Sequence, residues 1–137
     1  MKLSGGCLCG KVRYEGEGEP MFAAKCHCTD CRKACGSGHA ALAGFNGDAV
    51  KITGDLQGFD LKADSGSTVT HHFCPNCGFR VFNSNSAMPG ASIIYLTTLD
   101  DPESVLPAVS IFTDSAVGWD HIDPSIPQFA KMPNADK

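Results

Sequence analysis

The stretch Cys74-Pro75-Asn76-Cys77-Gly78 decides the fold of this chain, because it has the form of a zinc knuckle. Two cysteines separated by two residues can bind one zinc ion when the backbone between them turns tightly. Pro75 fixes one φ angle of such a turn, and Gly78 tolerates the positive φ that the turn often requires. A redox-active pair would instead open a helix after a strand, and residues 70–83 do not show that pattern. The motif therefore predicts two ligands of a structural zinc site.

A closed structural zinc site needs four ligands, and a second cysteine pair lies near the start of the chain. Cys7-Leu8-Cys9 is flanked by glycines, which let a backbone bend around a metal without Cβ clashes. Together with Cys74 and Cys77, this pair completes a four-thiolate site that would fasten the N-terminal segment to a distant hairpin. The alternative is that Cys7 and Cys9 are simply small buried hydrophobic residues.

A third cluster, Cys26-His27-Cys28-Thr29-Asp30-Cys31, places three cysteines within six residues. Their sulfurs converge if Cys26 ends a strand and a helical turn begins near Thr29, where helix N–H groups would stabilise thiolates. Three protein ligands leave one coordination position open, which is typical of catalytic zinc, whereas structural sites fill all four. We favour an open zinc site on Cys26, Cys28 and Cys31. A closed zinc site and a metal-free thiol cluster are the alternatives.

Cys35 is the last of the eight cysteines to be assigned. It follows Cys31 by four residues, so it can complete the second site as a fourth thiolate, which would make that site chemically quiet. It can equally be an ordinary buried thiol, which is the role we favour because cysteine is among the most frequently buried residues.

The histidines and the single tryptophan do not by themselves indicate a second kind of site. His27 lies between two expected ligands, and strand alternation predicts that its side chain points away from them. His71 and His72 precede the knuckle and are expected to fill a strand. Trp119 and Phe112 can line a pocket, but core packing is the expected role of each.

Length and patterning predict one all-β domain over residues 1–137, since a domain usually has roughly 100 to 200 residues. Gly, Pro, Asn and Asp separate runs of strand length, and only residues 29–35 and 101–104 suggest short helical turns. The proline-containing segment 120–129 is expected to run extended across the sheet surface. The predicted strands are Lys11–Glu15, Met21–Lys25, His39–Phe45, Ala49–Ile52, Thr68–Phe73, Arg80–Phe82, Ile93–Leu96 and Val109–Phe112.

Charge and hydropathy exclude several classes of partner. The formal net charge is −4 and no basic cluster is present, so binding to nucleic acid has no electrostatic basis. No apolar run approaches the roughly 20 residues that a membrane span needs, and the first ten residues do not resemble a signal peptide. We therefore expect a soluble cytoplasmic protein with reduced thiols, no membrane contact and no nucleic-acid partner.

Three cysteine motifs in this order resemble the glutathione-dependent formaldehyde-activating enzyme family. The matching residues are Gly5-Gly6-Cys7-Leu8-Cys9-Gly10-Lys11-Val12-Arg13-Tyr14, Cys26-His27-Cys28-Thr29-Asp30-Cys31-Arg32-Lys33 and Phe73-Cys74-Pro75-Asn76-Cys77-Gly78. Residues 111–119 and 126–129 are also similar to members of the family, so the resemblance runs from about Gly5 to Phe129.

The resemblance implies a small all-β domain of the Mss4-like type, stapled by zinc, with two zinc ions per chain. One ion would be structural and bound by the four paired cysteines described first. The second would be bound by Cys26, Cys28 and Cys31, with glutathione binding nearby. The family's reaction condenses glutathione with formaldehyde to S-hydroxymethylglutathione and is classed with the carbon–sulfur lyases. One departure is Cys35, where a residue other than cysteine is commoner.

The preferred hypothesis is therefore a zinc-dependent enzyme of the carbon–sulfur lyase type that handles a small thiol such as glutathione and an aldehyde such as formaldehyde. A zinc bound by three thiolates is a weak Lewis acid but a good place to hold a fourth sulfur. The alternative is a non-catalytic, zinc-stabilised binding module of the Mss4-like type, with both zinc ions structural.

Overall fold

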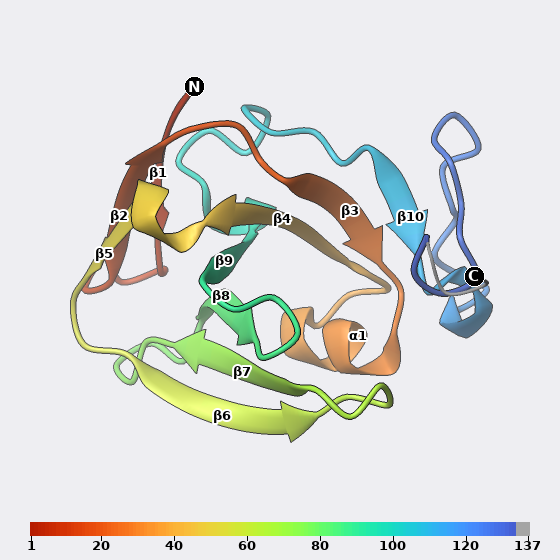
Figure 1. Cartoon of the computed structure of the whole chain (residues 1–137), viewed down its shortest axis with the longest axis horizontal. Coiled ribbons are helices and arrows are strands. Elements are labelled where there is room, and N and C mark those ends of the chain that lie inside the picture. The colour runs from red at the N-terminus through yellow and green to blue at the C-terminus, as the bar shows by residue number, and fades with distance from the viewer. Residues whose placement is uncertain (134–137) are drawn as a thin grey trace.

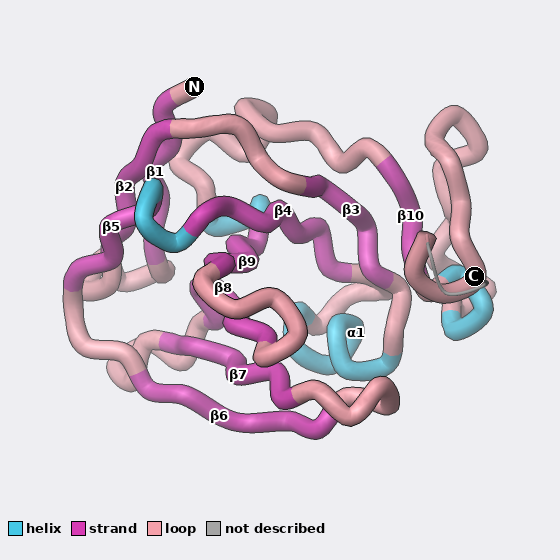
Figure 2. Tube along the Cα trace, in the orientation of Figure 1, coloured by secondary structure: helices cyan, strands magenta, loops and turns pink. Residues whose placement is uncertain are grey.

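The computed structural model describes residues 1–133, and these consist mainly of short strands with one α-helix (Figures 1 and 2). Three 3₁₀ turns connect some of them. The strands are β1 (Lys2–Gly6), β2 (Arg13–Glu17), β3 (Phe22–Cys26), β4 (Ala40–Asn46), β5 (Val50–Thr53), β6 (Gln57–Lys62), β7 (Thr68–Phe73), β8 (Arg80–Asn85), β9 (Ala91–Tyr95) and β10 (Val109–Ile111). The helix is α1 (Thr29–Cys35), and the 3₁₀ turns are η1 (Gly47–Ala49), η2 (Leu96–Thr98) and η3 (Thr113–Ser115).

The strands form two sheets. A seven-stranded sheet has the order β10-β3-β4-β9-β8-β7-β6, and a three-stranded sheet has the order β1-β2-β5. Neighbouring strands are antiparallel except for β10, which runs parallel to β3. Figure 1 shows α1 lying between the β3–β4 part of the large sheet and its β6–β7 end. The all-β prediction is confirmed.

Both faces of the central strands are buried. Along β4, Ala43 and Phe45 pack into one apolar cluster, whereas Ala40 and Leu42 pack into another. In β9, Ile94 belongs to the first cluster, and its two neighbours along the strand belong to the second. Alternate residues of a strand face opposite sides, so two covered faces produce the nearly continuous apolar runs of these strands. Both clusters contain cysteines, so both candidate metal centres have ligands within the packed core.

Each of the eight predicted strands overlaps an observed one, and the helix at residues 29–35 is confirmed. Residues 101–104 form a turn rather than a helix, closed by the Ser104 N–H donating to the Asp101 carbonyl oxygen. The strands β1 and β6 were not predicted. Each offers little apolar alternation: β1 contains one large apolar residue and two glycines, and β6 is largely exposed at the sheet edge.

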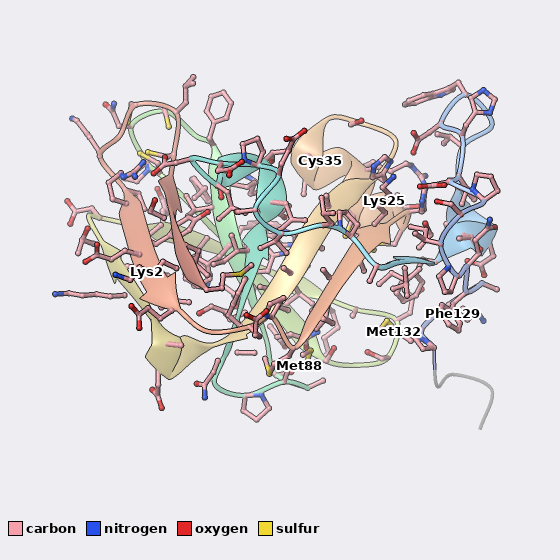
Figure 3. All side chains as sticks on the ribbon, turned by 90° about the horizontal axis from the view of Figure 1, so that it is seen from above. Lys2, Lys25, Cys35, Met88, Phe129 and Met132 are labelled. Carbon is pink, nitrogen blue, oxygen red and sulfur yellow. The ribbon has the colours of Figure 1, made fainter. Side chains whose placement is uncertain are left out.

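The segment after Trp119 was predicted to run across the face of the sheet, and this prediction is wrong. The segment instead runs beside the edge strand β10. The Ser110 N–H donates to the Pro127 carbonyl oxygen over 2.9 Å, and the Phe129 N–H donates to the Ser110 carbonyl oxygen over 2.9 Å. Figure 3 shows Phe129 and Met132 in this part of the chain. An edge strand has unpaired backbone groups, and here the C-terminal segment supplies partners for them.

Trp119 is 71% exposed, so its predicted place in the core is wrong. Phe112, in contrast, packs against the second apolar cluster as predicted. In the described residues, no helix is long and apolar enough to cross a lipid bilayer.

Candidate metal centres

The sulfurs of Cys7, Cys9, Cys74 and Cys77 lie together, each within 4.8 Å of the others. The Cys7 and Cys9 sulfurs are 3.6 Å apart, and those of Cys9 and Cys74 are 3.7 Å apart. In a tetrahedral zinc site with bonds of about 2.3 Å, neighbouring sulfurs are separated by roughly 3.8 Å. The four side chains are therefore spaced as zinc ligands, although the two pairs come from opposite halves of the sequence.

Each pair lies in a tight turn that ends on a glycine with positive φ. Gly10 has φ 82° and donates its N–H to the Cys7 carbonyl oxygen, and Gly78 has φ 78° and donates to the Cys74 carbonyl oxygen. The Val12 N–H also donates to the Cys7 sulfur over 3.3 Å. Left-handed backbone is inexpensive only for glycine, which explains why both motifs end as they do.

The second cluster is built where β3 passes into α1. Cys26 is the last residue of β3, Cys28 is the N-cap of α1, and Cys31 lies in its first turn. The Cys31 N–H donates to the Cys28 sulfur over 3.3 Å, so the thiol occupies the capping position that Ser or Asp often fills. The three sulfurs lie within 4.8 Å of one another, and Cys26 and Cys31 are only 4% and 8% exposed. The predicted convergence is thus present.

The three thiols of this cluster have opposed pKa shifts. Hydrogen bonding from the Cys26 side chain is the main cause that lowers the pKa of Cys28, to about 2. The same contact raises the pKa of Cys26 to about 12, and hydrogen bonding with Cys26 raises the pKa of Cys31. The protein alone therefore favours one thiolate here, because a second negative charge at this separation is repelled. Full ionisation of all three requires a cation between them, and this donor set suits zinc.

Cys35 does not join these three sulfurs. Its thiol donates to the His39 carbonyl oxygen over 3.2 Å and is exposed, so the predicted burial of this residue is wrong. Within residues 1–133, the group formed by Cys26, Cys28 and Cys31 contains no fourth Cys, His, Asp or Glu ligand atom. The cluster accordingly offers three protein ligands.

A buried polar network that the sequence did not reveal lies near the second cluster. Tyr95 packs in the same apolar cluster as Cys26 and Cys31, and its hydroxyl donates to the Asn83 side-chain oxygen over 3.2 Å. The His71 ring nitrogen Nδ1 lies 3.3 Å from the same hydroxyl. Burial raises the pKa of Tyr95 and lowers that of His71, so both side chains stay uncharged near neutral pH. Strand alternation alone gives no signal for this network, because its members come from three strands.

Arg32 and His27 belong to the same sequence motif as the second cluster. The Arg32 guanidinium donates to the carbonyl oxygens of His27 and Ser115, so it fastens α1 to the η3 turn. His27 is buried and points away from the Cys26 and Cys28 sulfurs, toward His39 and Asp120, as alternation predicts.

Comparison with known proteins identifies the family of this chain and a protein with a similar fold. Residues 2–115 match the family model described as glutathione-dependent formaldehyde-activating enzyme. The chain belongs to the glutathione-dependent formaldehyde-activating enzyme family. It is also similar to a crystal structure of a Rhodobacter sphaeroides protein at 19% identity, covering 91% of this chain and 98% of that one, with a TM-score of 0.58. This likeness shows a shared fold. No curated protein matches the chain.

Membership supports a glutathione-dependent formaldehyde-activating or related function at the level of the family. The two cysteine clusters described above can hold zinc, which agrees with the metal chemistry of that family. Glutathione and an aldehyde are thereby indicated as the classes of small molecule that the family handles.

Proposed function

We propose that this protein is a zinc-dependent enzyme of the carbon–sulfur lyase type, which joins a small thiol such as glutathione to an aldehyde such as formaldehyde. The observation that carries the proposal is the group of Cys26, Cys28 and Cys31, which has three converging sulfurs and no fourth ligand atom in the described part of the chain. Three protein ligands and one open position are typical of catalytic zinc.

In this proposal the four-sulfur cluster holds a structural zinc, and the three-sulfur cluster holds the second. Cys7 and Cys74 are buried, and both belong to the main apolar core. Removing the ion would leave crowded sulfurs inside that core, so this site contributes to stability. The second cluster lies at the end of β3 and the start of α1. It is the cluster with an available coordination position.

The reaction forms a bond between the thiol sulfur and the carbonyl carbon, and the thiol proton ends on the carbonyl oxygen. When bound, zinc with three thiolates supplies a position that favours an incoming thiol in its ionised form. The chain supplies the geometry. The β3 end and the first turn of α1 fix the three sulfurs, and Arg32 fastens that turn through its backbone partners. Holding both reactants at one place contributes by proximity.

The decisive experiment combines zinc content, glutathione affinity and formation of the adduct. Wild type should bind two zinc ions at its cysteine clusters, bind glutathione, and accelerate adduct formation from glutathione and formaldehyde, as followed by exchange NMR. The Cys31→Ala variant should lose the last two properties while remaining folded. A wild type that ignores glutathione while Cys35→Ala binds it would show that Cys35 closes the site in solution. That outcome favours a non-catalytic binding module.

A further inference from the structure

A third cluster of metal-binding side chains lies beside the second cysteine cluster and has no role in the function proposed above. It consists of His27, His39 and Asp120, each of which offers one ligand atom within 4.8 Å of the other two. The His39 Nδ1 and the Asp120 Oδ2 atoms are 2.6 Å apart, and the His27 Nδ1 atom lies 3.5 Å from the same oxygen. The two imidazole rings are 5.1 Å apart between centroids.

His27 is the member that lacks partners. Its side chain is fully buried, and among the described residues neither ring nitrogen has a hydrogen-bond partner. A buried polar group without a partner is costly, and structures rarely keep one unless a ligand, ion or water satisfies it. The Nδ1 atom is directed at the carboxylate that His39 already contacts. A group that accepts nitrogen lone pairs would therefore give His27 the partner that it lacks.

The position of Asp120 is built into the fold. A Cβ atom added to Gly38 would lie 2.4 Å from both the Cβ and the Cγ atoms of Asp120. The carboxylate can therefore occupy this place only because residue 38 has no side chain. The Asp120 N–H also donates to the Val117 carbonyl oxygen in a turn that presents the carboxylate to the two histidines. An accidental surface contact would not require such an arrangement.

We propose that His27, His39 and Asp120 form a third metal site, specific for a divalent transition-metal cation such as zinc, cobalt(II) or nickel(II). Two imidazoles and one carboxylate suit these ions, whereas calcium and magnesium require sets of oxygen ligands. In a tetrahedral site, zinc–nitrogen and zinc–oxygen bonds of about 2.0–2.2 Å place ligand atoms roughly 3.4 Å apart. The His27 Nδ1 and Asp120 Oδ2 atoms, 3.5 Å apart, already have this spacing, and the His39–Asp120 pair at 2.6 Å reaches it by a small side-chain shift.

The bound cation would join the C-terminal segment to the strand end that carries Cys26. His27 belongs to the turn between β3 and α1, His39 directly precedes β4, and Asp120 comes from the loop after η3. The ion would therefore hold in place the turn that carries Cys26 and Cys28, without sharing a ligand with the second cysteine cluster. This inference does not depend on the thiol reaction. The competing arrangement is a metal-free clasp in which His39 and Asp120 share a hydrogen bond.

The test is a cobalt(II) titration of protein loaded with only the two equivalents of zinc that the cysteine clusters bind, followed by absorption spectroscopy. We expect one further equivalent to bind and to give ligand-field bands without thiolate-to-cobalt charge transfer, because the donors are nitrogen and oxygen. Asp120→Asn and His39→Gln should each weaken this binding at least tenfold. Matched control variants are Asp114→Asn and His121→Gln, which change exposed residues of the same part of the chain and should bind as wild type does.

Gly38→Ala provides a test that keeps all three ligands. The added methyl group should displace Asp120, and we expect a similar loss of cobalt affinity while circular dichroism remains unchanged. The proposal is overturned if protein with zinc at both cysteine clusters binds no cobalt, or if the added equivalent brings thiolate bands. It is also overturned if Asp120→Asn and His39→Gln bind the added ion as tightly as wild type.

Discussion

Cys31 and Cys35 lie one helical turn apart but have opposite environments. Residues four apart share a face of a helix, so the spacing in the sequence is compatible with Cys35 as a fourth ligand of the second site. In the structure α1 ends at Cys35, and the thiol turns to the His39 carbonyl oxygen. Cys31 instead is buried with Cys26. Spacing alone could not separate these outcomes, because the direction of a side chain at a helix end depends on the chain that follows.

Cys35→Ala is expected to be nearly neutral. The substitution removes one exposed sulfur and one weak hydrogen bond, so the free energy of unfolding should fall by about 1 kcal/mol or less. Two equivalents of zinc and the affinity for glutathione should both be retained. Denaturant titration, metal analysis and calorimetry with glutathione measure the three quantities. Loss of one zinc equivalent from this variant would make Cys35 a ligand and contradict the assignment.

Cys77→Ala and Cys31→Ala are expected to damage different properties. Cys77 belongs to the four-sulfur cluster, where the bound metal contributes to folding, so its loss should unfold or aggregate the protein. Cys31→Ala should leave a folded protein that no longer binds thiol. Circular dichroism and thermal melting follow the first effect, and glutathione binding follows the second, with Cys35→Ala as the matched cysteine control. The reverse order of damage would exchange the roles of the two clusters.

At the scale of elements, the sequence was informative where both sides of a strand are buried. The apolar residues of β4 and β9 identify these strands because each face packs into its own cluster. The strand β6 carries almost no such signal, since it is exposed at the edge and its existence depends on hydrogen bonding to β7. The same reason explains the segment 120–129, whose place beside β10 is fixed by backbone pairing that leaves no mark in side-chain pattern.

The end of α1 provides a test at this scale. Gly36 has φ 69° and donates its N–H to the Arg32 carbonyl oxygen, which closes the helix that carries Cys28 and Cys31. Gly36→Ala should lower the free energy of unfolding by about 1 kcal/mol, because a Cβ is strained at positive φ. Gly118→Ala is the matched control, since nothing lies within 4 Å of the added Cβ atom and its φ is not positive. Denaturant unfolding measures both, and equal stability would contradict the capping argument.

At the scale of the whole molecule, the fold and both cysteine clusters were recognisable from three short motifs, because ligand spacing and turn glycines constrain the backbone locally. The cluster of His27, His39 and Asp120 was not recognisable. Asp120 lies 81 residues beyond His39, and only the path of the C-terminal segment brings the two together. Its signal in the sequence is a lone aspartate and a glycine at position 38, neither of which is distinctive before the structure is known.

The two cysteine clusters should release zinc at different points of a graded chelation. The four-sulfur cluster links the turn after β1 in the small sheet to the β7–β8 turn in the large sheet, and two of its cysteines lie in the main core. Its zinc should resist chelators until the protein unfolds, since metal binding there is coupled to folding. The three-sulfur cluster should lose its zinc first, with far-UV circular dichroism unchanged, because an incoming chelator can occupy the open position. Metal content and circular dichroism measured at each chelator concentration test this order. Release of both ions in one step, or a stoichiometry near one, would contradict two separate roles.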